Sequence, residues 1–132
     1  MTEIFCTYTG DGNTQLVHGP TGEKIQTDLP PDNGGQGRHF SPTDLLASAF
    51  ASCVLTIMGK MAQARGEKLD GASIRIDKIM AQNPRRVGEF KLALTFPPHF
   101  SDAQKKFYAT AISACPVHQT LHPDVKVTVN VQ

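Results

Sequence analysis

Residues 41–66 read SPTDLLASAFASCVLTIMGKMAQARG, and this stretch decides the fold. Ser41 suits the N-cap of a helix and Pro42 its first position, while Asp44 completes a variant of the capping box with Ser41. Gly66 is a typical C-terminal stop. The spacing therefore predicts a helix over residues 41–65, in which roughly 23 helical residues at 1.5 Å each make a rod of about 34 Å.

The predicted helix carries no charged side chain from Leu45 to Met58. An amphipathic surface helix would show charges on one side at every turn, whereas a helix that is apolar all round is buried all round. A chain of 132 residues cannot wrap such a rod alone, so we expect a second subunit to cover it. Ala47, Ala49 and Ala51 would let another helix approach closely.

The rest of the chain predicts an α+β fold with antiparallel sheets, because strand-like runs come in groups rather than alternating with helices. A single domain over residues 1–132 accounts for the length. The alternation of apolar residues in 73–81 is lost near Lys78 and Ile79, which predicts a bulge. The predicted segments are a β-meander at 1–28, a glycine- and proline-rich loop at 28–40, the central helix at 41–65, and a ββαβ segment at 73–131, with strands at 73–81, 87–96 and 125–131 and a helix from 101 to about 114.

Composition excludes several classes of protein. Thirteen Lys and Arg against twelve Asp and Glu give a net charge of +1, which argues against a nucleic-acid binder and against a polybasic membrane-surface protein. The N-terminus lacks the pattern of a signal peptide, and the charge-free stretch 45–59 is too short to cross a bilayer. We therefore expect a cytoplasmic protein whose three cysteines stay reduced.

Cys53, in the middle of the predicted helix, and Cys115, before Pro116, allow two interpretations. Both can be small core residues, since free cysteine is often buried. Alternatively they form a redox pair, in which one thiolate attacks a peroxide and the other cysteine condenses with the resulting sulfenic acid. A mid-helix thiolate needs a nearby cation. Arg38 is the best candidate for that cation, and His39 is a weaker one.

Residues 40–53, FSPTDLLASAFASC, resemble the first cysteine helix of the OsmC/Ohr family, and residues 115–121, CPVHQTL, resemble its second cysteine segment. The resemblance implies an intertwined homodimer with two long central helices between β-sheets. It also implies a thiol peroxidase for hydroperoxides, with its site at the dimer interface. Cys53 would be the peroxidatic cysteine and Cys115 the resolving one, and an external dithiol, such as a lipoylated protein or another thiol system, would supply electrons. No cofactor is implied.

The sequence departs from the best-studied branches of that family in two places. Those branches carry a glutamate directly after the proline, where it pairs with the catalytic arginine. Here that position is Thr43 and the acid comes one residue later, a rotation of roughly 100° around a helix. Asp44 is thus either the arginine's partner or only the helix cap. The turn at 10–13 also lacks the arginine of the Ohr branch, which favours a broader OsmC-like branch.

Two other functions remain open from the sequence. Cys115, His118 and His122 have the spacing Cys-x2-His-x3-His, which would suit a metal site if residues 116–122 are helical. A binding protein that keeps the fold without the peroxidase activity is the other alternative. The first strand holds the remaining cysteine, Cys6, for which we expect a structural role. For a peroxidase, the apolar helix favours organic hydroperoxides over hydrogen peroxide.

Overall fold

Three antiparallel strands make the sheet at the start of the chain. The computed structural model describes residues 1–132 and divides them into two units, Met1–Leu46 and Ala47–Gln132. In the first unit the strand order is β1-β2-β3, as the predicted meander requires. Asp11 and Gly12 take positive φ angles of 53° and 78° in the turn between the first two strands. The strands are β1 (Ile4–Gly10), β2 (Asn13–His18) and β3 (Lys24–Asp28).

The predicted loop after β3 contains one turn of 3-10 helix, η1 (Pro31–Asn33). Gly35 folds back against the carbonyl group of Leu29 so closely that a Cβ atom has no room there. The amide N–H of Asp28 donates to the carbonyl of Phe40 at 3.1 Å, which closes the loop at the start of the helix. The loop is therefore held at both ends by backbone contacts.

The long helix α1 (Pro42–Arg65) begins and ends where the sequence predicts. The amide of Asp44 donates to Ser41 Oγ at 3.1 Å, and the amide of Ser41 donates to Asp44 Oδ2 at 2.8 Å. Together these bonds make a capping box. Gly66, with φ of 66°, ends the helix.

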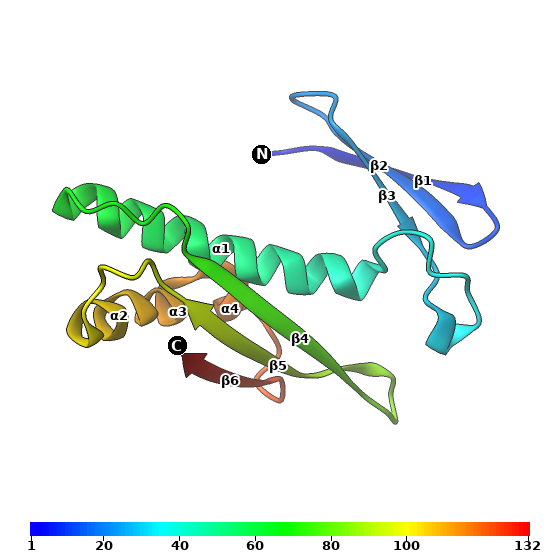
Figure 1. The fold of residues 1–132 in the computed structure, drawn as a ribbon. Coiled ribbons are helices and arrows are strands. Elements are labelled where there is room, and N and C mark those ends of the chain that lie inside the picture. Colours follow the sequence, from blue (N-terminus) through cyan, green and yellow to red (C-terminus); the bar gives the residue numbers. More distant parts are fainter. The chain divides into compact units, whose positions relative to one another are not determined.

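The second unit contains a three-stranded sheet in the order β4-β5-β6 (Figure 1). Along the chain, three short helices connect β5 to β6. β4 and β5 form an antiparallel hairpin whose register shifts between Ile79 and Met80, which confirms the predicted bulge. β5 and β6 are parallel, so the prediction of purely antiparallel sheets is wrong for this pair. The helical crossover returns the chain to the starting end of β5. The elements are β4 (Ser73–Ala81), β5 (Arg86–Thr95), α2 (Asp102–Ala109), α3 (Ala111–Ala114), α4 (Pro116–Thr120) and β6 (Lys126–Val131).

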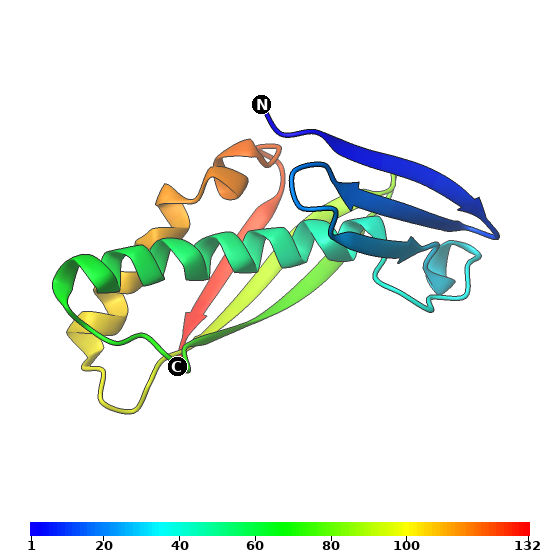
Figure 2. The same ribbon diagram turned by 90° about the horizontal axis from the view of Figure 1, so that it is seen from above.

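One stripe of α1 packs on this sheet and supplies the core of the second unit (Figure 2). The rings of Phe50 on α1 and Phe90 on β5 meet edge to face with centroids 5.6 Å apart. On the other side of α1, Ala49, Ser52 and Thr56 are exposed in the single chain. The helix is thus not buried on all faces by its own chain, although by length and composition it is apolar enough to cross a membrane. The buried residues of α1 are Ala47, Phe50, Val54, Met58 and Ala62.

Hydrogen bonds tie the end of α1 to α2. The hydroxyl of Tyr108, which is fully buried, donates to Glu67 Oε2 at 2.6 Å, and Arg65 Nε donates to Glu67 Oε1 at 3.1 Å. The Tyr108 hydrogen bond holds the pKa of Glu67 below its ordinary value, while burial raises the pKa of Tyr108. The guanidinium of Arg65 also lies 4.6 Å from the ring centroid of Phe107. These contacts fix α2 and, through it, the segment that leads to Cys115.

Candidate active site

The fold brings the side chains of Cys53 and Cys115 close enough to interact, although 62 positions separate them in the sequence. Cys53 lies on α1, three residues after the buried Phe50, and is partly exposed. Cys115 is fully buried at the junction of α3 and α4, where its backbone is extended. Both cysteines are free thiols.

The surroundings of Cys115 keep it protonated. Burial raises the pKa of the Cys115 thiol above its ordinary value, and the hydrogen bond with Cys53 raises it further. The backbone N–H groups of His118 and Val117 act in the opposite direction, but more weakly than burial. Cys115 therefore holds its proton more tightly than an ordinary thiol does.

His118, three residues after Cys115, packs on the helix that carries Cys53. Its ring stacks on the ring of Phe50, with centroids 5.5 Å apart and planes inclined by 7°. Its Nδ1 atom is buried and has no hydrogen-bond partner. The sequence singles out His118 only through its spacing with Cys115 and His122, which fits either a metal ligand or a surface or interface histidine. The contact with Phe50 joins two segments with no local signal in common.

The metal-binding alternative fails on geometry. No group of three His, Cys, Asp or Glu side chains gathers anywhere in the structure in a way that could hold a metal ion. The helix α4 ends before Leu121, which is extended with ψ of 146°, so the helical spacing assumed for His122 does not continue. His122 is instead exposed, with Nδ1 3.6 Å from Asp124 Oδ2.

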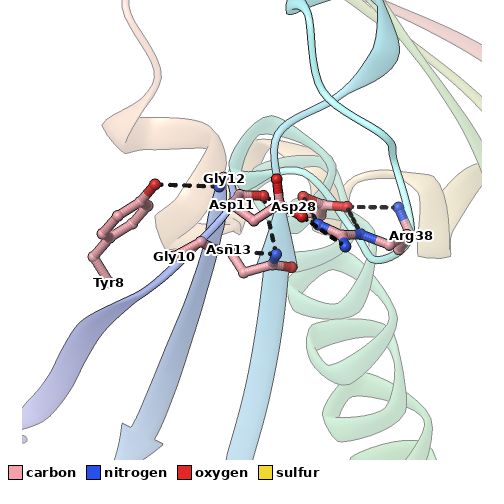
Figure 3. A network of polar contacts seen from close by, with 7 residues as sticks. All are labelled: Tyr8, Gly10, Asp11, Gly12, Asn13, Asp28 and Arg38. Atoms are coloured by element: carbon pink, nitrogen blue, oxygen red, sulfur yellow. Dashed lines mark hydrogen bonds and ion pairs between the residues drawn. The ribbon is translucent and has the colours of Figure 1, made fainter.

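Arg38 is held in the first unit by two carboxylates (Figure 3). Its Nε donates to Asp28 Oδ2 at 2.8 Å, its backbone N–H donates to the same oxygen at 2.9 Å, and one terminal nitrogen donates to Asp11 Oδ2 at 3.1 Å. The side chain of Asp28 is wholly buried, and the hydrogen bonds from Arg38 lower its pKa from 3.8 to about 2. In turn, the bond to Asp28 raises the pKa of Arg38.

Asp44 has the geometry of a helix cap, through its two hydrogen bonds with Ser41. The carboxylates that hold Arg38 are Asp28 and Asp11, neither of which the sequence singled out. Asp28 ends a strand and Asp11 sits in a turn, positions where aspartate is ordinary, so no sequence signal distinguishes them. Cys6 is exposed on β1.

The comparisons with known proteins agree on one family. The model of OsmC-like proteins matches residues 35–130. A Psychrobacter arcticus protein, provisionally assigned as an osmotic stress induced and detoxification response protein, is 40% identical, with a TM-score of 0.94 over 100% of this chain and 96% of that one. No curated protein matches the chain.

More distant solved structures share the fold. An OsmC-like protein from Mycoplasma pneumoniae is 23% identical, with a TM-score of 0.83 over 100% of this chain and 96% of that one. An organic hydroperoxide resistance protein from Legionella pneumophila is 20% identical, with a TM-score of 0.76 over the same shares. At these identities the likeness concerns the fold alone.

Proposed function

Because the chain belongs to the family of OsmC-like proteins, we propose that it is a cysteine-based thiol peroxidase that reduces hydroperoxides, organic ones in particular. The observation that carries this proposal is that the side chains of Cys53 and Cys115 interact. Two cysteines must be neighbours in the fold before their sulfurs can form a disulfide. The names of related structures, which include organic hydroperoxide resistance proteins, support the same activity.

The proposed reaction has three steps. The thiolate of Cys53 attacks one oxygen of the peroxide, the O–O bond breaks, and the other oxygen leaves as an alcohol after taking up a proton. Cys115 then attacks the sulfur of the Cys53 sulfenic acid, forms the disulfide and releases water. An external dithiol, such as a lipoylated protein or another thiol system, reduces the disulfide and becomes a disulfide itself.

The two cysteines differ in the way that these roles require. Cys115 is fully buried and its pKa is raised, so it reacts poorly with a peroxide from solution. Cys53 is partly exposed, and its side chain interacts with that of Cys115. Cys53 thus suits the peroxidatic role and Cys115 the resolving role.

Arg38 is the proposed cation for the Cys53 thiolate, on the strength of the family resemblance. In the structure its guanidinium also satisfies two carboxylates. The contact with Asp11 is the more exposed of the two, since 71% of the Asp11 side chain is accessible, against none of the Asp28 side chain. We infer that Asp28 holds Arg38 in place. The contact with Asp11 is the one that the Arg38 guanidinium can exchange for another anion. Asp44 acts as the helix cap in this scheme.

We further propose that the enzyme works as a cytoplasmic homodimer. The exposed side of α1 offers small side chains to a second copy, as Ala49 and Ser52 show. The proposal includes no nucleic acid, no membrane and no cofactor. The fold shared with the OsmC-like structures is that of a soluble protein, and α1 serves in it as a core helix.

Oxidation with cumene hydroperoxide tests the function. In a single turnover we expect two free thiols to be lost per chain and mass spectrometry to find a Cys53–Cys115 disulfide, which reduced lipoamide then opens. Cys53→Ser should abolish peroxide consumption. Cys115→Ser should leave a Cys53 sulfenic acid that dimedone traps. Cys6→Ser is the matched control and should behave like the wild type, since Cys6 lies on another sheet.

Wild-type thiols that stay unchanged under these conditions would refute the peroxidase and support the alternative, an OsmC-fold binding protein without activity. A disulfide that includes Cys6 would refute the assignment of Cys115 as the resolving cysteine.

A further inference from the structure

One polar atom of the second unit lacks the partner that buried polar atoms normally have. Nδ1 of His118 is buried, and no donor or acceptor of the protein bonds to it. About 90% or more of buried polar groups in proteins are hydrogen-bonded, because leaving water without a new partner is unfavourable. An unsatisfied imidazole nitrogen therefore calls for a functional explanation.

Two separate contacts tie His118 to the segments that carry the two thiols. Its ring lies flat on Phe50, which precedes Cys53 by three residues on α1. Its backbone N–H points toward the sulfur of Cys115 at the start of α4. The His118 ring thus joins α4, which follows Cys115, to α1, which carries Cys53.

We propose that His118 is the proton acceptor in the step that joins Cys115 to Cys53, an inference that rests on the proposed peroxidase function. As the sulfur of Cys115 attacks the sulfur of the Cys53 sulfenic acid, the thiol proton of Cys115 passes to Nδ1. The S–O bond of Cys53 breaks, and the departing hydroxide takes the proton from Nδ1 and leaves as water. The imidazole ends neutral, and the sulfurs end as a disulfide.

The surroundings of Cys115 make such an acceptor necessary. The thiol is fully buried, so water does not remove its proton freely, and burial holds its pKa above the ordinary value. Neutral imidazole is the side chain best suited to take a proton near neutral pH. Because Nδ1 has no partner in the reduced protein, no hydrogen bond has to break before it accepts the proton.

His118→Ala separates this role from the rest of the reaction. In a single turnover with cumene hydroperoxide, Cys53 should be oxidised at the wild-type rate, but the disulfide should form more slowly, by on the order of 10²-fold. Dimedone should then trap a Cys53 sulfenic acid that the wild type does not accumulate. Free imidazole should restore the rate by filling the space over Phe50, whereas pyrrole, a ring of similar size without an acceptor nitrogen, should not.

Two further variants serve as controls. His118→Phe keeps an aromatic ring over Phe50 and should show the same slow second step, which excludes loss of packing as the cause. His122→Ala removes an exposed imidazole and should match the wild type. Wild-type disulfide formation in His118→Phe, or equal rescue by imidazole and pyrrole, would overturn the proposal. Absence of any Cys53 sulfenic acid in the Cys115→Ser chain would instead refute the peroxidase function itself.

Discussion

Asp28 shows how much a single residue depends on its partner. Its side chain is wholly inaccessible, yet it stays charged, because Arg38 donates to it from both the side chain and the backbone. A buried carboxylate without such donors would have a raised pKa rather than a lowered one. The pair therefore links the stability of the first unit to the protonation of one carboxyl group.

The stability of the protein should fall in acid through this pair. Since the folded pKa of Asp28 is about 2 and its ordinary value is 3.8, its contribution is fully present above pH 4 and is lost as pH falls toward 2. Arg38→Ala should lower the free energy of unfolding strongly at pH 7 and less at pH 3, as measured by urea denaturation. Arg75→Ala removes the same charge from an exposed ion pair with Asp77 and should have little effect at either pH. An equal loss at both pH values in Arg38→Ala would contradict this account.

At the scale of elements, α1 and β5 hold the second unit together. The helix presents a stripe of buried residues at intervals of three and four, and the strand presents alternate apolar residues to it. Phe50 and Phe90 join the two elements, and the stack of His118 on Phe50 adds α4 to the same cluster. The packing that stabilises the unit thus also positions the two thiols.

Phe90→Ala should cost about 3–5 kcal/mol of unfolding free energy, because it opens a cavity under α1 at a fully buried position. Lys91→Ala, at the next position on the opposite face of β5, should change stability by less than about 0.5 kcal/mol. Urea denaturation at pH 7 measures both. Comparable losses in the two variants would show that the face of β5 toward α1 is not the core.

At the scale of the whole molecule, each unit leaves apolar surface uncovered in the single chain. The first sheet exposes Ile4, Phe5 and Tyr8 to the extent of 63%, 57% and 69%. The second unit exposes one side of the charge-free stretch of α1. Exposed apolar surface of this extent is typical of a protein that associates with a partner. A second copy of the chain is the partner that we propose.

Analytical ultracentrifugation should find twice the chain mass of 14.3 kDa. Ala49→Glu puts a charge on the exposed side of α1 and should shift the protein to monomer, since an unpaired charge is costly to bury at an interface. Ala103→Glu makes the same change on an exposed position of α2 and should leave the dimer intact. A wild-type monomer at micromolar concentration would refute the proposed dimer.

Elements with local signals could be predicted from the residues alone. The capping box of Ser41 and Asp44 lies within four residues, Gly66 ends the helix by its own backbone preference, and the alternation in β5 needs only its own ten residues. Contacts between distant groups became known only from the folded chain. It paired Asp28 with Arg38, laid His118 on Phe50, ended α4 before His122 and made β6 parallel to β5. Such contacts depend on how packed elements approach each other in space. The residues between two contacting groups show no periodic pattern from which that approach could be predicted.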